Sequence, residues 1–217
     1  MVDIVVAKYN EDIAWTRNVK PGARVILYNK GHDSCGVKLP NVGREAHTYL
    51  YHIVQFYDEL APVTVFCQGH PFDHASDFHK RIKNVVSGRE QIKDFTWLGF
   101  IIDTDDKRGR SLFIHWSKNV EGEELPLDQF YYTLFKKESP EIFRFYPGGQ
   151  FIVRAETIRK RSKAFYQKAL NLSEKFLHSA HCFERIWDQV FGCSGVDETL
   201  LKGENCVYLK PIKRLIT

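Results

Sequence analysis

The sequence predicts an α/β fold, in which residues 1–217 form a single domain around a mixed, mostly parallel sheet flanked by helices. Three observations support this prediction. Short, β-branched apolar runs that are typical of buried strands alternate with amphipathic helical segments. Clusters of polar residues follow the strands directly. No internal repeat, low-complexity segment or linker divides the chain, and about 200 residues is an ordinary size for one domain.

The alternation is clearest in the first half of the chain. Buried strands are expected at Ile4–Ala7, Ala23–Tyr28 and Val63–Cys67, because these runs are short, apolar and rich in β-branched residues. Helices are expected over residues 46–57, where apolar residues recur with a helical period, and over residues 76–86. Strands that alternate with helices in this way form a parallel sheet, whose ligands bind beyond the carboxyl ends of the strands.

The second half is less regular. We expect strands at Trp97–Asp103, Leu112–Trp116, Gln150–Arg154 and Val207–Leu209. Apolar residues mark one helix from Phe165 to Phe176 and another from Phe183 to Phe191.

Composition and charge exclude several classes of protein. The net charge is only +4, from 31 basic and 27 acidic residues, and the basic residues are dispersed, so no nucleic-acid partner is expected. The five cysteines are odd in number, widely spaced and without a CxxC pair, which argues against a disulfide framework and a structural zinc site. The N-terminus lacks the pattern of a signal peptide, and no run reaches the ~18 apolar residues of a membrane span. A cytoplasmic location is the resulting prediction.

Polar residues at the ends of the first two strands are candidates for binding a nucleotide. Tyr9 and Glu11 follow the first strand and Asn29 follows the second. Loops at this edge of an α/β sheet hold the base and ribose of nucleotides, and a carboxylate can accept hydrogen bonds from either. The alternative is that the segment from Asn10 to Asp12 begins a short helix.

Arg44 lies at the start of the long helix, directly after Gly43. A helix N-terminus presents free N–H groups and partial positive charge, so it suits a phosphate, and a guanidinium adds a fork of donors. The alternative is that Arg44 lies on a solvated helix face, paired with a carboxylate.

The loop after the third strand, residues 68–77, is rich in side chains that bind metals. Gln68 begins it, and His70 and Asp73 are the candidate ligands for Mn²⁺ or Mg²⁺, which would neutralise a leaving diphosphate. The alternative is that Asp73 caps a turn while the histidines pack or face water. His74 and Asp77 would complete the ligands of a metal-dependent hydrolase.

Three further segments contain candidate residues. Asp103–Asp106 includes a DxD pattern but is interpreted as a charged surface turn, because a run of basic residues follows it. Gly149 belongs to a glycine pair that lets the backbone approach a ligand closely. Glu184 and Asp188 are spaced to share a polar helix face, where one carboxylate could deprotonate an acceptor hydroxyl. Two solvent-facing carboxylates are the alternative.

Several sequence blocks, in this order, resemble an uncharacterised family of fungal, bacterial and large-virus proteins. The most specific are NVGREAHTYL and QGHPFDH, and VVAKYNEDIAW, PGGQFIVRAETI and HCFERIWDQVFG also fit. The family is similar to GT-A glycosyltransferases and to a viral capsid-glycan transferase domain. The resemblance implies that Tyr9 and Glu11 hold the nucleotide and that Glu184 occupies the place of the base in inverting members. Gln68-Gly69-His70 falls where GT-A enzymes have DxD, so this chain departs from that pattern.

The resulting prediction is a GT-A-like glycosyltransferase. It would move a sugar from a nucleotide sugar, expected to be UDP-linked, to a glycan, a glycoprotein or another hydroxyl acceptor, with inversion and with help from a metal. Two alternatives remain open: a metal-dependent hydrolase that uses the loop from His70 to Asp77, and a non-catalytic module that binds a nucleotide sugar or carbohydrate.

Overall fold

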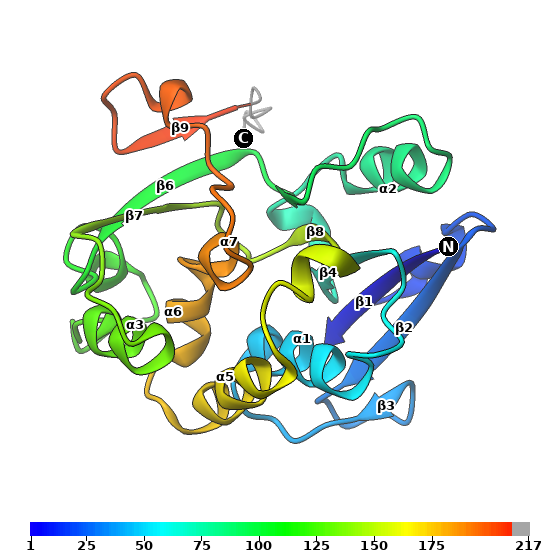
Figure 1. The fold of residues 1–217 in the computed structure, drawn as a ribbon, viewed down its shortest axis with the longest axis horizontal. Helices are drawn as coiled ribbons and strands as arrows, with labels where there is room; N and C mark the ends of the chain where they lie inside the picture. Colours follow the sequence, from blue (N-terminus) through cyan, green and yellow to red (C-terminus); the bar gives the residue numbers. More distant parts are fainter. Residues whose placement is uncertain (210–217) are drawn as a thin grey trace.

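The computed structural model describes residues 1–209 of the chain (Figure 1). The α-helices are α1 (Arg44–Gln55), α2 (Phe78–Val86), α3 (Leu127–Phe135), α4 (Ala155–Ile158), α5 (Lys163–Lys175), α6 (Ser179–Glu184) and α7 (Trp187–Val190). The strands are β1 (Val2–Lys8), β2 (Ala23–Asn29), β3 (Val37–Lys38), β4 (Val63–Gln68), β5 (Phe95–Trp97), β6 (Ile101–Asp106), β7 (Ile142–Phe145), β8 (Phe151–Arg154) and β9 (Cys206–Tyr208). Short 3₁₀ turns lie at Ala14–Asn18, Pro71–Asp73, Phe113–His115 and Glu198–Leu201.

The main sheet has six strands in the order β3-β2-β1-β4-β8-β5. Strand β1 pairs in parallel with β2 and with β4, and β2 pairs in parallel with β3. Strand β8 lies between β4 and β5 and is antiparallel to both. The mixed, mostly parallel sheet flanked by helices is therefore confirmed.

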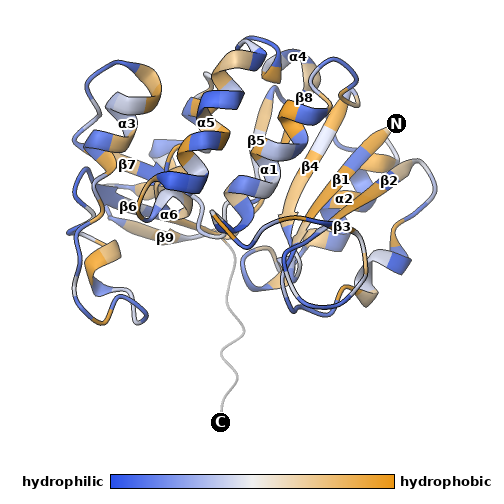
Figure 2. Ribbon diagram, turned by 90° about the horizontal axis from the view of Figure 1, so that it is seen from below, coloured by the Kyte–Doolittle hydropathy of each residue, from blue (hydrophilic) through white to orange (hydrophobic). Residues whose placement is uncertain are grey.

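Both faces of the sheet are covered, as the strands' unbroken apolar runs require. Side chains alternate across the sheet, so that Val5 and Phe66 belong to the core beneath α1, while Ile4 and Val65 belong to the core beneath α2. In Figure 2 the strands β1, β2 and β4 are largely hydrophobic, whereas α1 and α5 show both hydrophilic and hydrophobic stretches. Each helix thus buries one face against the sheet or a neighbouring helix.

Helix α1 buries one apolar face in the larger core. Tyr49, Leu50 and Ile53 are fully buried and contact the sheet at the spacing that the sequence predicts. The N-cap residue is Gly43, which takes a left-handed backbone with φ 57°. The helix therefore begins at Arg44, two residues before the expected start.

A second, three-stranded antiparallel sheet, in the order β7-β6-β9, lies beside the main sheet (Figure 1). It overturns three expectations. The strand expected at Trp97–Asp103 is two strands, β5 and β6, in different sheets. The segment Asp103–Asp106, interpreted as a surface turn, is part of β6, and the strand expected at Leu112–Trp116 is a 3₁₀ turn.

The C-terminal elements follow the prediction in part. The helix expected from Phe183 to Phe191 is broken into α6 and α7, and helix α3 is not predicted from the sequence. The last strand lies at Cys206–Tyr208, one residue from its expected position. Residues 210–217, the end of the predicted domain, lie outside the described residues.

Candidate functional site

The order of strands creates a switch point between β1 and β4. Strand β2 lies on one side of β1, and β4 lies on the other. The connections that follow β1 and β4 therefore leave the carboxyl edge of the sheet in opposite directions. The Glu11 carboxylate accepts the backbone N–H of Tyr9 at 2.6 Å. It also lies over Gly69, where an added Cβ would approach Glu11 Oε2 to 2.7 Å. The loops after β1 and β4 therefore touch at this edge.

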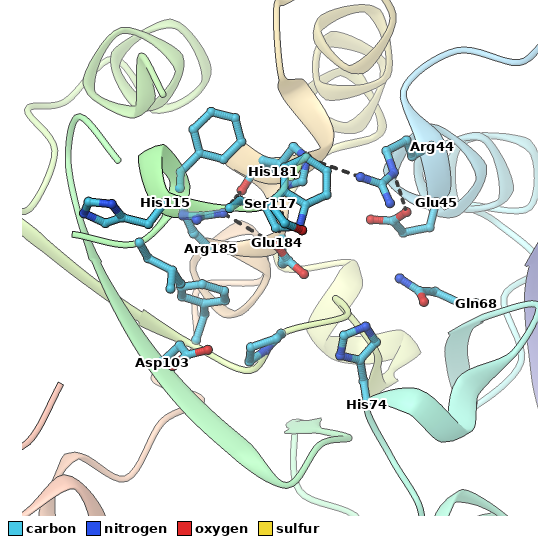
Figure 3. Close-up of a pocket in the computed structure, with 15 residues that line it drawn as sticks. Arg44, Glu45, Gln68, His74, Asp103, His115, Ser117, His181, Glu184 and Arg185 are labelled. Atoms are coloured by element: carbon cyan, nitrogen blue, oxygen red, sulfur yellow. Dashed lines mark hydrogen bonds and ion pairs between the residues drawn. The ribbon is translucent and has the colours of Figure 1, made fainter. Parts of the chain in front are cut away.

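A cavity of about 450 Å³ lies next to this switch point (Figure 3). Its wall comes from the first turn of α1, the end of β4, the small sheet, the 3₁₀ turn at Phe113–His115 and the end of α6. The lining residues are Arg44, Glu45, Gln68, His74, Asp103, Leu112, Phe113, His115, Trp116, Ser117, Phe145, Pro147, His181, Glu184 and Arg185. Gln68 joins the two regions, because it lines the cavity and immediately precedes Gly69.

A buried lysine fixes the start of α1 through hydrogen bonds to its backbone. The Lys30 amine donates hydrogen bonds to the backbone carbonyls of Val42 and Arg44, and burial lowers the pKa of Lys30 to about 8. Arg44 itself has a positive φ of 46°, which is uncommon outside glycine. Its guanidinium reaches His181, where Nη1 donates to Nε2 at 3.2 Å.

These contacts fix the state of His181. Arginine is only a donor, so His181 Nε2 must accept, and its proton then lies on Nδ1. Nδ1 faces Glu184 Oε2 at 3.8 Å. Burial lowers the pKa of His181, which keeps the ring neutral near pH 7.

Glu184 is a tightly held carboxylate in the cavity wall. Its Oε1 accepts the N–H of Gly148 at 2.6 Å, and its Oε2 lies 3.6 Å from Arg185 Nη1. Burial alone would raise the pKa of Glu184, but the contacts with His181, Arg185 and Gly148 outweigh burial and lower this pKa to about 2. Glu184 is therefore ionised throughout the physiological range.

Two other carboxylates in the cavity have the opposite tendency. Burial raises the pKa of Glu45 and of Asp103, and the negative charge of Glu184 raises both further. Glu45 lies in the first turn of α1, and its Oε2 is 3.8 Å from Arg44 Nε. Figure 3 shows Glu45 beside Arg44, with its carboxylate directed into the cavity.

One wall of the cavity is aromatic. The Trp116 and Phe113 rings lie 4.6 and 5.0 Å from the His181 ring, measured between centroids, and Arg44 lies 5.9 Å from the Trp116 centroid. Rings of this kind offer an apolar face to the C–H groups of a sugar, while the neighbouring polar groups can bind its hydroxyls.

A buried ion pair supports that wall from behind. Arg185 donates through Nε and Nη2 to Asp105 Oδ2 at 2.9 and 2.6 Å, and both side chains are almost fully buried. Asp105 also accepts the backbone N–H groups of Leu112 and Phe113. It therefore holds the 3₁₀ turn at Phe113–His115, which explains why this apolar segment does not pair as a strand.

The structure brings Arg44, Gln68 and Glu184 to the cavity and Tyr9 and Glu11 to the adjoining switch point. Gln68 Nε2 donates to the carbonyl of Gly148 at 3.1 Å.

The glycine pair is explained by packing. An added Cβ on Gly148 would lie 2.4 Å from the His74 ring, and Gly149 is buried with φ 58°, close to Trp187. Gly149 therefore forms part of the support of the cavity.

Asn29 is not at the cavity. It is fully buried, and its amide donates to the backbone carbonyls of Asp33 and Cys35 while its Oδ1 accepts the N–H of Gly31. Asn29 therefore holds the loop after β2, which overturns its expected contact with a nucleotide.

Asp188 does not lie on the helix face where it was expected. The helix breaks after Glu184, so the two carboxylates do not share a face, and Asp188 is only 6% exposed. Its Oδ1 and Oδ2 accept the N–H groups of Gln189 and Gly195 at 2.8 and 3.0 Å. Asp188 thus fastens residues 193–195 to α7.

The expected metal ligands pair with each other. His70 Nδ1 lies 3.3 Å from Asp73 Oδ1, and both side chains are exposed. Within residues 1–209, no three His, Cys, Asp or Glu side chains gather with the spacing of a metal site. His74 lines the cavity and is separate from the exposed pair of His70 and Asp73. His70 and Asp73 thus lie on an exposed loop and not in the wall of the cavity.

Several residues of the cavity were not predicted as site residues, among them Glu45, Trp116, His181 and Arg185. Glu45 follows Arg44 directly, and His181 and Arg185 are the first and last residues of the HCFER segment, so all three lie within sequence blocks that were already singled out. Trp116 falls in a segment that the apolar pattern assigns to a strand, and no local signal reveals its role.

Comparison with known protein families gives a match over most of the chain. The profile of a family described as "Protein of unknown function (DUF3431)" matches residues 4–207. Among curated proteins, none matches the chain. No helix within the described residues has the length and apolar character needed to cross a membrane.

Proposed function

The chain belongs to the DUF3431 family, and we propose that it transfers a sugar from a nucleotide sugar to a hydroxyl acceptor. The single observation that supports this most is the continuity of two regions through Gln68. A nucleotide-type switch point lies on one side of Gln68, and a cavity with carboxylates, an arginine and aromatic rings lies on the other. A nucleotide sugar also has two parts, a nucleotide for the switch point and a sugar for the cavity.

The residues suggest a role for each region. Tyr9 and Glu11 lie where an α/β sheet holds a nucleoside, because the loops after β1 and β4 diverge there. Arg44 and the N-terminus of α1 provide the positive charge for a diphosphate. Trp116 and Phe113 provide a face for a sugar.

The reaction needs one ionised carboxylate in the cavity. That carboxylate takes the proton of the acceptor hydroxyl as the acceptor oxygen bonds to the anomeric carbon of the donor. The bond from this carbon to the diphosphate oxygen breaks, and the nucleoside diphosphate leaves with the electron pair. A single displacement of this kind inverts the anomeric configuration.

A divalent cation is assigned no step. Mn²⁺ or Mg²⁺ would neutralise the leaving diphosphate, but His70 and Asp73 form an exposed pair of their own. The effect of either ion is therefore left to measurement. The same dispersal of ligands gives no support to the hydrolase alternative. We keep the cytoplasm as the proposed location, and all five cysteines are free thiols.

Thermal denaturation with nucleotides tests the proposal. UDP at 100 times its dissociation constant should add ~2.7 kcal/mol of stability, which raises the melting temperature by roughly 5–10 °C for a chain of this size. Titrations of UDP, GDP and their sugar conjugates, each with and without Mn²⁺, identify the donor. If none of them shifts melting at millimolar concentration, the proposal is wrong.

An arginine variant locates the diphosphate. Arg44→Met should weaken nucleotide binding roughly ten- to hundredfold, because a charge-assisted hydrogen bond contributes about 1.5–3 kcal/mol. Arg89→Met is the matched control, since Arg89 is exposed near the end of α2 and away from the cavity. Turnover of the bound donor, measured as release of UDP in the presence of candidate acceptors, then separates an enzyme from a binding module.

A further inference from the structure

Two glutamates face the same cavity, and the protein holds their carboxylates differently. Glu184 uses Oε1 for the Gly148 N–H at 2.6 Å and presents Oε2 to Arg185 and His181 at 3.6 and 3.8 Å. One oxygen of Glu184 is therefore bonded to the protein, and the other faces an arginine and a histidine. These neighbours stabilise the charged form of Glu184, so a proton taken up there would weaken its interaction with them.

Glu45 is held far more loosely. Its closest ion pair among the described residues is with Arg44 Nε at 3.8 Å, beyond the length of a hydrogen bond, and its other contact is with its own backbone N–H. The side chain is 11% exposed, so it is mostly shielded yet reachable from the cavity that it lines. It lies beyond the buried glycine loop, with Oε1 3.9 Å from the position of a Cβ on Gly149.

The mounting of Glu45 is rigid. The next residue, Ala46, is fully buried, and the first turn of α1 is fixed by the Lys30 amine through the carbonyls of Val42 and Arg44. A group that transfers a proton must be held in place in this way while its own oxygens remain open.

We infer that Glu45 is the residue that accepts the proton of the acceptor hydroxyl, and that Glu184 is a positioning residue that holds the Gly148 loop and orients His181 toward Arg44. This inference rests on the proposed function. The acceptor oxygen loses its proton to Glu45 as it bonds to the anomeric carbon. The nucleoside diphosphate departs with the electron pair, and Glu45 then returns the proton to water.

The charges around Glu45 agree with this role. Burial and the negative charge of Glu184 raise the pKa of Glu45, while Arg44 and Lys30 oppose the shift. Tyr49 of the same helix is neutral, because burial holds its pKa well above the usual value. Carboxylates whose environments drive their pKa values apart are typical of an acid–base site, and the one with the higher pKa is the better proton acceptor.

Paired variants and a pH profile test the assignment. The rate of UDP release is measured with the nucleotide sugar that stabilises the chain most. The parent chain should lose activity in acid with a midpoint above 4.5, as Glu45 becomes protonated. Glu45→Gln should lower turnover by about 10²–10⁴-fold and abolish this acidic limb while the UDP-induced melting shift persists. Glu184→Gln should keep the acidic limb with a smaller loss of turnover.

The control is Glu156→Gln, an exposed glutamate on α4 that should behave as the parent. Glu45→Asp, which shortens the arm but keeps the carboxylate, should retain the limb at reduced turnover. An acidic limb that persists unchanged in Glu45→Gln, or that vanishes in Glu184→Gln, overturns the assignment.

A readout independent of turnover separates this inference from the proposed function. Titration of ¹³C-labelled glutamate carboxyls by NMR should show a Glu45 midpoint above 4.5 and a Glu184 midpoint near 2. A Glu45 midpoint at or below 4.5 overturns the inference even if sugar transfer is observed. If the parent chain turns over no nucleotide sugar, the proposed function fails, and the proton-accepting role of Glu45 fails with it whatever the titration shows.

Discussion

Glu184 and Asp188 lie four residues apart, yet their carboxylates have opposite environments. Several polar groups stabilise the charge of Glu184 and lower its pKa to about 2, whereas burial raises the pKa of Asp188 to about 6 despite two backbone N–H donors. The difference arises because Asp188 has no basic side chain among the groups that act on its pKa. Folding therefore favours the neutral, protonated form of the Asp188 carboxyl.

This environment predicts a pH dependence for Asp188→Asn. A carboxyl whose folded pKa exceeds its unfolded value of 3.8 stabilises the fold at low pH and loses that contribution as pH rises through 6. The shift corresponds to ~3 kcal/mol. The asparagine variant should therefore gain about that much stability relative to the parent between pH 4 and pH 7.5, measured by urea unfolding. A stability difference that stays constant with pH would contradict the prediction.

The role of a residue could be predicted only where its neighbours in the structure are also its neighbours in the sequence. Arg44 follows Gly43 at a helix start, and Gln68 ends a strand, so both were placed near the cavity in advance. Asn29 gives the same strand-end signal but turns inward, because the carbonyls of Asp33 and Cys35 curl back over its amide. Nothing local distinguishes these two outcomes.

At the scale of an element, β6 shows how a distant partner changes the structure. The segment Asp103–Asp106 is highly charged, and in isolation such a run is typical of a turn. It forms a strand because Asp105 is neutralised by Arg185, which is 80 residues away, and because the backbone pairs with β7. A buried carboxylate with a buried guanidinium partner cannot be recognised from a short window of sequence.

Removing that partner should be costly. Arg185→Met leaves Asp105 as an unpaired buried charge and should reduce the free energy of unfolding by ~3–5 kcal/mol. Arg144→Met removes a half-exposed partner of Glu198 in the same small sheet and should cost no more than ~1 kcal/mol. Chemical denaturation of both variants makes the comparison, and the double variant Asp105→Asn with Arg185→Met should recover part of the loss. Equal costs for the two arginines would show that the buried pair is not essential.

At the scale of the whole molecule, helix α1 contains two buried histidines whose protonation affects the stability of the fold. Helix α1 buries His52 completely, and burial lowers the pKa of this histidine to about 4. Its Nδ1 is hydrogen-bonded to the Tyr28 hydroxyl at 3.0 Å, which ties α1 to β2. His47 of the same helix is shifted in the same direction by burial. Both rings must remain neutral for α1 to pack against the sheet.

Acid should therefore weaken the packing of α1 against the sheet. The unfolded chain binds a proton at His52 below pH 6.5 and the folded chain does not, so the stability that His52 contributes falls by ~3 kcal/mol as pH drops from 6.5 to 4. His52→Phe removes this part of the dependence and leaves the part due to His47, although it leaves the Tyr28 hydroxyl unpaired and lowers stability at neutral pH. The exposed His32→Phe variant should retain the parent's acid sensitivity. Urea unfolding from pH 4 to 7.5 checks both, and an unaltered slope in His52→Phe would refute the explanation.

The sequence predicts the half of the fold in which successive elements are neighbours. Strands β2 and β4 both pair with β1, and helices α1 and α2 pack on the same sheet, so periodicity and turn residues suffice to predict these elements. Strand β8 was expected as a strand, but its antiparallel place between β4 and β5 depends on a return of the chain from far away. The cavity was missed for the same reason, since its walls come from residues 44 to 185.

That return has a consequence for how the protein can change. Trp97 at the end of β5 is paired directly with Phe151 at the start of β8, and Leu98 donates to the carbonyl of Gln150 at 2.8 Å. The intervening residues 98–150, which supply the aromatic wall, thus depart from and rejoin the sheet at a single rung of the ladder. Loops closed at fixed ends tolerate changes in length at little cost, since each doubling adds only ~0.6 kcal/mol. Changes in the length of this insert can therefore reshape the aromatic wall, while the switch point between β1 and β4, which lies outside the insert, stays the same.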